Sequence, residues 1–243
     1  MDPLDLLLAA LAVVAGSVAA VAGFGIGSLL TPAVGLAVGT KAAVAIVAVP
    51  HFVATAIRLW ALREFVDRRV LLSFGLASAA GGLLGALLHA TFSSPILAIV
   101  LGALLIAGGL LELTGLGGRL EFSGPWSNVA GFASGAFGGL VGNQGGIRSA
   151  ALLRFGLSPR ALVATATATA ILVDAVRVPV YVASSATDLI EHWPTVVALT
   201  AGAIVGTFLG GPILKRIPDA TFRRLVAVTL IALGVALLGG AGR

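Results

Sequence analysis

Most positions of this chain are apolar, and its polar residues gather in short stretches between long hydrophobic runs. Several runs approach the roughly 20 residues that a helix needs to cross a bilayer. The runs cover residues 4–22, 42–57, 70–90, 95–111, 161–173 and 225–241. Because hydrophobic and polar residues do not alternate with a period of two, the pattern predicts an all-α polytopic membrane protein and not a β-barrel.

The hydrophobic pattern occurs twice along the chain. At an offset of 119 residues, identical or similar residues align without a gap: Gly16 with Gly135, Gly23 with Gly142, Gly27 with Gly146, Lys41 with Arg160, and Arg58 with Arg177. After a few extra residues in the second copy, the ladder Ser78, Gly82 and Ala86 aligns with Gly202, Gly206 and Gly210. We therefore predict two transmembrane repeats in one integrated membrane domain, residues 1–118 and residues 119–243.

Each repeat has the same expected order: a helix, a glycine-rich break, a short apolar segment and three long helices. The short segments, residues 28–38 and 147–156, hold about 11 residues and would span roughly 16 Å as helices, about half the hydrocarbon core. Each break is thus either a broken helix or the tip of a re-entrant hairpin. The sequence leaves open whether the short segments cross the bilayer fully.

Loop charges predict that the two repeats have inverted topology. The loop at 63–69 is basic, whereas its counterpart at 184–192 has no Lys or Arg, and its ionisable residues are two acidic residues and one histidine. In the next pair of equivalent loops, the basic loop belongs to the second repeat. The loop at 89–95 in the first repeat has no Lys or Arg. Its counterpart at 214–224 carries Lys215, Arg216, Arg223 and Arg224. Basic loops favour the cytoplasmic side, so equivalent loops are expected on opposite sides.

The breaks, "GFGIGS" at 23–28 and "GNQGGI" at 142–147, are the candidate binding site. Transporters built from inverted repeats bind substrate near the midplane, where interrupted helices meet. A helix that starts at a break offers free N–H groups and a positive dipole end to an anion. The candidate substrate-binding residues are Arg148, Asn143, Gln144, Gly145, Gly146, Gly25, Gly27, Ser28 and Thr31.

Arg148 is the foremost of these candidates, and the aligned position in the first repeat is Leu29. The competing interpretation is that the glycines only allow close helix packing and that Arg148 extends to the membrane interface. The two breaks occupy the same position in the repeats, and one of them has two amides and an arginine. These features favour the interpretation that the breaks bind a substrate.

Four other residues are candidates for coupling or gating: Asp174, Arg177, Arg58 and His51. Charged residues within membrane helices are costly and are often functional. Asp174 and Arg177 are expected on the last turns of a long helix, and a pair between them within that helix, or extension toward a membrane face, accounts for these charges equally well. His51 follows Pro50 in a helix and is able to titrate, although a packed histidine is the commoner case.

Composition narrows the function. The chain has 243 residues, of which 58% are hydrophobic, and it has no cysteine. Its three histidines are far apart, so no metal site and no cofactor are expected. Ser134 in "GFASG" has no histidine suited to act as its base, so no catalytic residues are predicted and the chain is not expected to be an enzyme. No Walker motif is present, and no nucleic-acid partner is expected. A metal-cation permease or channel is the main alternative function, and an intramembrane enzyme is a weaker one.

The stretches "GSVAAVAGFGIGSLLTPAVGLAVGTKAAVAIVAVP" (16–50) and "GFASGAFGGLVGNQGGIRSAALLRFGLSPRALVATATATA" (131–170) resemble the sulfite exporter TauE/SafE family, also described as 4-toluene sulfonate uptake permeases. The resemblance implies a secondary transporter that carries sulfite, thiosulfate or organosulfonates across the cytoplasmic membrane of a prokaryote. Its partners would be a small anion and the lipid bilayer, and a homodimer is allowed. The chain departs from the family pattern at Asn143 and Gln144, and at Ala151 where the first copy has Pro32. These departures bear on the substrate more than on the fold.

Overall fold

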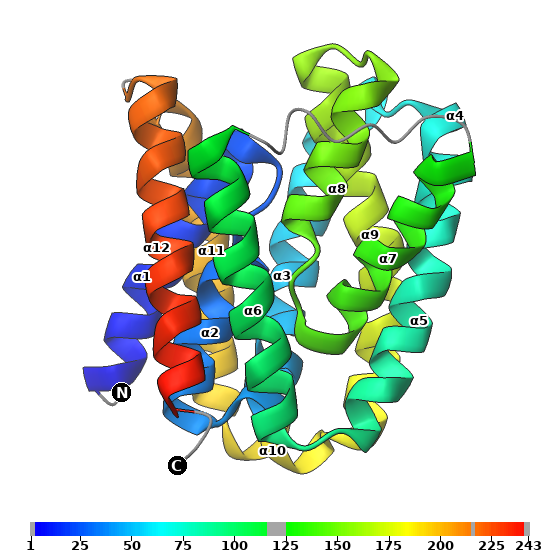
Figure 1. Ribbon diagram of the computed structural model, residues 1–243. Coiled ribbons are helices and arrows are strands. Elements are labelled where there is room, and N and C mark those ends of the chain that lie inside the picture. Colours follow the sequence, from blue (N-terminus) through cyan, green and yellow to red (C-terminus); the bar gives the residue numbers. More distant parts are fainter. Residues whose placement is uncertain (1–2, 116–124, 215–216, 241–243) are drawn as a thin grey trace.

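The computed structural model describes residues 3–115, 125–214 and 217–240, and this part of the chain is a bundle of helices (Figure 1). Seven helical segments within it are long and apolar enough to cross a membrane. The chain is therefore a multi-pass membrane protein, as the hydrophobic runs predict. The first helices are α1 (Pro3–Ala22), α2 (Ile26–Val38), α3 (Thr40–Leu62), α4 (Arg68–Val70), α5 (Leu76–Thr91) and α6 (Ser94–Thr114).

The later part of the chain also consists of long and short helices. Its helices are α7 (Pro125–Val141), α8 (Gly145–Leu152), α9 (Pro159–Ser184), α10 (Ala186–Glu191), α11 (Trp193–Leu214) and α12 (Asp219–Gly240). A 3-10 turn, Leu153–Phe155, continues α8, so the segment predicted at 147–156 consists of a short helix and this turn. The boundary predicted between residues 118 and 119 lies outside the described residues.

Glycine ladders join helices that are distant in the sequence. Helix α1 packs along α11, and α5 packs along α7. A Cβ atom at Gly16 would lie 2.4 Å from the Ala203 carbonyl oxygen, and one at Gly135 would lie 1.8 Å from that of Ser78. Such backbone contact requires residues without a side chain, as in small-xxx-small packing. The first helix of each part of the chain therefore has its main partner in the other part.

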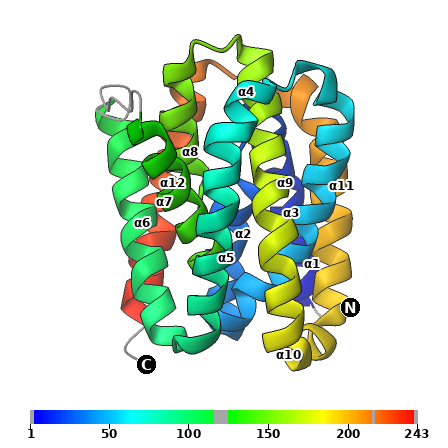
Figure 2. The same cartoon turned by 90° about the vertical axis from the view of Figure 1, so that its right-hand side faces the viewer.

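Helices α3 and α9 pack against each other inside the bundle, and α6 packs along α12. Figure 2 shows the bundle from the side on which α5 and α9 face the viewer. Helix α9 extends to Ser184, well beyond the hydrophobic run predicted at 161–173. Asp174 and Arg177 thus lie in the middle of α9, and the prediction that they occupy its last turns is wrong. The helix continues because these charges have buried partners, described below.

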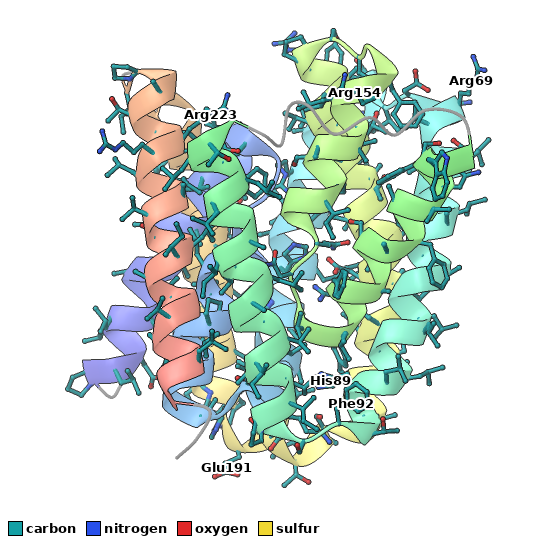
Figure 3. All side chains as sticks on the ribbon, viewed as in Figure 1. Arg69, His89, Phe92, Arg154, Glu191 and Arg223 are labelled. Carbon is teal, nitrogen blue, oxygen red and sulfur yellow. The ribbon has the colours of Figure 1, made fainter. Side chains whose placement is uncertain are left out.

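Charged side chains differ between the two ends of the bundle. Arg69, Arg154 and Arg223 lie at the upper end in Figure 3, whereas Glu191 and His89 lie at the lower end. Helix α1 begins and α12 ends at the lower end (Figures 1 and 2). The basic loop at 63–69 and the start of α12 thus share one end of the bundle. Lys215 and Arg216, which were part of the charge argument, lie outside the described residues.

Candidate functional site

Both glycine-rich breaks begin with a glycine of positive φ that ends the preceding helix. Helix α1 ends before Gly23 and α7 ends before Gly142, and these glycines have φ angles of +75° and +74°. Their N–H groups donate to the carbonyls four residues earlier, Ala19 and Gly138, at 3.0 and 3.1 Å. A glycine with positive φ at this position is the usual end of a helix. Each break then turns the chain directly into a second, shorter helix.

The two breaks lie against each other. A Cβ atom at Gly27 would be 2.2 Å from the Gly142 carbonyl oxygen, so the backbones are in contact. The Ser28 hydroxyl donates to Asn143 Oδ1 at 2.9 Å, which joins the first residues after one break to the other. Two segments more than 100 residues apart in sequence therefore form one structure inside the bundle.

Arg148 is the central charged group of this structure. It lies in α8, and only 1% of its surface is exposed. Its Nη2 donates to the Gly23 carbonyl oxygen at 3.4 Å. Within the described residues, Nε and Nη1 have no hydrogen-bond partner although both are buried. Because a buried donor without a partner costs free energy, these two N–H groups are suited to bind a ligand that supplies acceptors.

A small cavity beside Arg148 lies between the two breaks and is lined by residues of both. Its volume is about 10 Å³, close to the least that holds one water molecule. It is lined by Phe24, Gly25, Gly27, Ser28, His51, Gly142, Gln144, Gly145 and Arg148. The structure thus brings six of the nine predicted binding residues to one cavity.

The other three predicted binding residues lie beside this cavity. Asn143 reaches it only through its hydrogen bond with Ser28. Gly146 does not line it, and a Cβ atom there would meet no atom within 4 Å. Thr31 is 1% exposed and lies against Gly142, and its hydroxyl oxygen has no partner within the described residues. Gln144 likewise has a buried side-chain amide without a partner there, although it lines the cavity.

The predicted coupling residues form a buried network next to the cavity. His51 Nδ1 lies 2.7 Å from Asp174 Oδ2, and Arg177 Nε donates to Asp174 Oδ1 at 2.8 Å. Arg177 Nη1 also donates to the Gly138 carbonyl oxygen at 2.6 Å. Asp174 and Arg177 therefore do form the helical pair considered from the sequence, and they do not extend to a membrane face, since both are buried. No feature of the sequence indicated that His51 would join them.

Arg58, which aligns with Arg177, has different surroundings. Its Nε donates to the Thr167 hydroxyl at 3.1 Å, and its Nη1 has no partner within the described residues. His51 and Arg58 lie seven residues apart on α3, which places them on one face of the helix. This face meets α9, so a polar seam runs between α3 and α9 from Arg58 to Asp174.

Three side-chain contacts with the second break and the end of α7 were not predicted from the sequence. The Tyr181 hydroxyl donates to the Gly139 carbonyl oxygen, and His89 Nδ1 lies 2.9 Å from the Leu140 carbonyl oxygen. Ser134 Oγ donates to the Gln144 carbonyl oxygen at 3.0 Å. These bonds satisfy carbonyls at the end of α7 and in the break, and so hold the break in place. The spacing of Asp174, Arg177 and Tyr181 on one helical face was the available signal for the first contact.

The buried charges make the interior positive. Among the described residues, the buried charged side chains are Arg58, Arg148, Arg177 and Asp174. With His51 neutral, three positive charges and one negative charge leave a net charge of +2. A buried net charge is unfavourable unless a counter-ion offsets it. No three His, Asp or Glu side chains gather as a metal site in the described part of the chain. The electrostatics suit an anion and not a metal cation.

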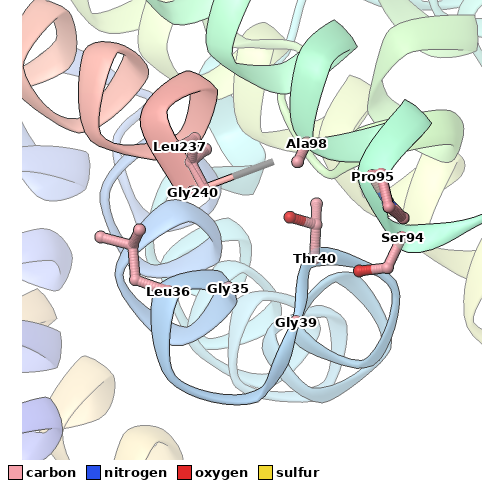
Figure 4. A pocket seen from close by; sticks show the side chains of 9 residues that line it. All are labelled: Gly35, Leu36, Gly39, Thr40, Ser94, Pro95, Ala98, Leu237 and Gly240. Carbon is pink, nitrogen blue, oxygen red and sulfur yellow. The ribbon is translucent and has the colours of Figure 1, made fainter. Parts of the chain in front are cut away.

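A larger cavity, about 170 Å³ in volume, lies between the ends of α2, α3, α6 and α12 (Figure 4). Its lining includes Gly35, Thr40, Ser94 and Leu237 but no charged side chain. We therefore place the candidate site at the smaller cavity, because only that cavity has a charged group with unsatisfied donors.

A comparison with protein families gives an independent finding. The family model described as sulfite exporter TauE/SafE matches residues 8–237 of the chain. The match includes both stretches on which the resemblance was based, residues 16–50 and 131–170, and it confirms that resemblance. Comparisons with curated proteins and with solved structures gave no match.

Proposed function

Because this chain belongs to the sulfite exporter TauE/SafE family of membrane transporters for sulfur-containing anions, we propose that it binds its substrate between the two breaks, beside Arg148. The substrate would be a small anion with sulfur-bound oxygens: sulfite, thiosulfate or an organosulfonate. Members of the family are transporters and not enzymes, so the residues at the breaks are interpreted here as binding groups.

The observation that carries this proposal is the state of the Arg148 guanidinium. It is buried, faces a cavity, and has two N–H groups without partners among the described residues. An oxyanion bound there accepts hydrogen bonds from both donors, and charge-assisted bonds of this kind are about twice as strong as neutral ones. The unpaired amide of Gln144 supplies a further donor in the same lining.

The arrangement of the breaks supports the inverted repeats on which this site depends. In the interpretation we propose, α1 and α2 form a hairpin that enters from the lower end, and α7 and α8 form one that enters from the upper end. Three spans follow each hairpin: α3, α5 and α6, and then α9, α11 and α12. Since basic loops favour the cytoplasm, the end with Arg69, Arg154 and Arg223 faces the cytoplasm of a prokaryotic cell.

The cavity volume supports an alternating-access mechanism. A sulfur oxyanion is larger than a water molecule, so it does not fit in a cavity of about 10 Å³. Binding then requires the two breaks to move apart, and this movement would break the contact between Gly27 and Gly142. Transporters of this general design expose a fixed midplane site to one side and then to the other.

The test is anion flux in proteoliposomes. Wild type is compared with Arg148→Gln, Arg148→Lys and a surface control, Arg223→Gln, whose guanidinium pairs with Glu112 in an exposed ion pair. We expect Arg148→Gln to weaken apparent affinity for sulfite or thiosulfate by roughly 10- to 100-fold, the value of a charged hydrogen bond. Arg148→Lys keeps the charge but loses the planar fork, so partial loss is expected.

Each outcome of this test decides between functions. Equal flux in Arg148→Gln and Arg223→Gln, both folded by size-exclusion chromatography, contradicts the proposed site. Flux of divalent cations without any anion dependence would favour the cation permease instead. Loss of sulfur-oxyanion flux only in the Arg148 variants supports the proposal.

A further inference from the structure

We propose that His51 binds a proton that travels with the anion, so that the protein is a proton-coupled anion transporter. This inference rests on the proposed function, because it places the proton beside the same cavity. It goes further by assigning the coupling ion and the atom that carries it.

His51 connects the cavity to the buried ion pair. Its ring lines the cavity together with Arg148 and Gly27, and only 6% of the residue is exposed. On the other side, Nδ1 lies 2.7 Å from Asp174 Oδ2. Within the described residues Nε2 makes no hydrogen bond, so it is the ring nitrogen left to meet a ligand.

The Asp174 carboxylate fixes which nitrogen carries hydrogen. An ionised carboxylate only accepts hydrogen bonds, so at 2.7 Å Nδ1 must be the protonated nitrogen. The neutral ring therefore presents the lone pair of Nε2 to the cavity, which repels an anion. The protonated ring presents an N–H group there, which attracts an anion. The anion and the proton consequently favour each other's binding, and this linkage is reciprocal.

Asp174 itself is poorly placed to carry the proton. It is 0% exposed, and both carboxylate oxygens are occupied, one by His51 and the other by Arg177. It therefore acts as a positioning residue that orients the ring of His51, much as carboxylates orient histidines elsewhere.

The charged groups around His51 come from two elements besides its own. Helix α9 contributes Asp174 and Arg177, and α8 contributes Arg148. The parts of α2 and of the second break that line the cavity contribute no titratable side chain. With His51 neutral, the group of His51, Asp174, Arg177 and Arg148 has a net charge of +1, and with His51 protonated it has +2. A divalent oxyanion balances the second state.

This pair has no counterpart at the aligned positions. At the 119-residue offset, the positions of His51 and Asp174 correspond to Ala170 and Thr55, and neither of these side chains titrates. Thr55 Oγ1 is buried without a partner among the described residues. Among the described residues that line the cavity, His51 is accordingly the one proton site.

The proton is taken from water on the side to which the cavity is open, and it binds Nε2 of His51. It is released to water on the opposite side after the anion leaves, so no other reactant is required.

The experiment measures proton and anion flux together in proteoliposomes that contain a trapped pH indicator, with the membrane potential clamped by potassium and valinomycin. Thiosulfate and methanesulfonate are the main probes because neither carries a proton near neutral pH. Sulfite is a third probe. The variants are His51→Asn, which retains a hydrogen-bond donor close to the position of Nδ1 but does not titrate, and His192→Asn. His192 is the matched control because it is a histidine that follows α10, away from both breaks, and does not line the cavity.

We expect about one proton per thiosulfate in wild type and in His192→Asn, and none in His51→Asn. For sulfite, His51→Asn should lose one proton per anion relative to wild type. Apparent thiosulfate affinity of wild type should rise as pH falls, by at most about tenfold per pH unit for one linked proton. The affinity of His51→Asn should not depend on pH.

Anion flux without proton movement in wild type overturns this inference and leaves the proposed function standing. Proton coupling that persists in His51→Asn also overturns it. Absence of flux for all three anions in wild type overturns both. If His51→Asn does not fold, proton uptake during thiosulfate binding by wild type, followed in weakly buffered detergent solution, decides the question. Uptake approaching one proton per bound anion supports the inference, and no uptake contradicts it.

Discussion

The two breaks begin with the same backbone turn but have very different side chains. Gly23 and Gly142 have φ angles within one degree of each other and end their helices with the same hydrogen bond. The second break then adds Asn143 and Gln144 and is followed by Arg148, whereas the first is built almost wholly from glycine and apolar residues. The two breaks thus share their first turn, and the polar side chains are concentrated in the second of them.

The two breaks also differ in the number of side chains that contact the carbonyl oxygens at the end of the preceding helix. Three side chains, Arg177, Tyr181 and His89, donate to or contact carbonyl oxygens of residues 138–140 at the end of α7. The end of α1 receives one comparable bond, from Arg148 to Gly23. The end of α7, beside the break that bears the polar groups, is therefore held by more side-chain contacts than the end of α1.

The largest expected contrast is between the aligned arginines. Arg177→Gln removes the partner of a fully buried carboxylate, and breaking a buried pair in this way costs about 3–5 kcal/mol. Arg58→Gln removes a charge that bonds only one hydroxyl, so the free energy of unfolding should change by less than about 1 kcal/mol, or rise. Thermal unfolding in detergent measures both variants. Equal destabilisation by the two changes would show that the halves are supported alike.

A smaller contrast is expected between the aligned glycines Gly27 and Gly146. A Cβ atom at Gly27 meets the Gly142 carbonyl oxygen at 2.2 Å, and one at Gly146 meets nothing within 4 Å. Overpacking costs about 1–3 kcal/mol, so Gly27→Ala should lower stability and reduce anion flux. Gly146→Ala should raise stability by up to about 1 kcal/mol, because alanine is the better helix former. Similar Tm values for both variants would contradict contact between the breaks.

The smallest expected effect concerns the single side-chain bond between the breaks. Ser28 Oγ donates to Asn143 Oδ1 at 2.9 Å. A double-mutant cycle with Ser28→Ala and Asn143→Ala should give a coupling energy of about 0.5–1.5 kcal/mol in stability. The pair Ser73→Ala and Asn143→Ala is the control, because Ser73 bonds only its own helix. Coupling of that size in the control pair, or none between Ser28 and Asn143, would mean that the hydroxyl does not join the breaks.

Features that depend on local sequence were predictable. Hydrophobic runs marked α1, α3, α5, α6, α9 and α12 but not α7 or α11. Glycine-rich stretches at 23–28 and 142–147 marked the interruptions, which the structure places at residues 23–25 and 142–144. Glycine has a backbone conformation open to few other residues, so its positions are informative without any tertiary contact. The charged residues also stood out, since charge is rare in apolar helices.

Features that depend on which helices become neighbours were not predictable. His51 and Asp174 are 123 residues apart, and their contact arises only because α3 packs against α9. The bond from Tyr181 to Gly139 depends in the same way on the packing of α9 against α7. Helical spacing showed that such residues share a face, but it did not identify the helix on the opposite side of the contact.

The pairing of α1 with α11 also constrains the order in which the protein can be assembled. During synthesis the first helix enters the membrane long before residues 193–214 have left the ribosome. Until then its glycine and alanine face, which includes Gly16, has only lipid or insertion machinery to cover it. Helix α1 must therefore wait for residues 193–214, and termination before them leaves a fragment in which α1 lacks its permanent neighbour.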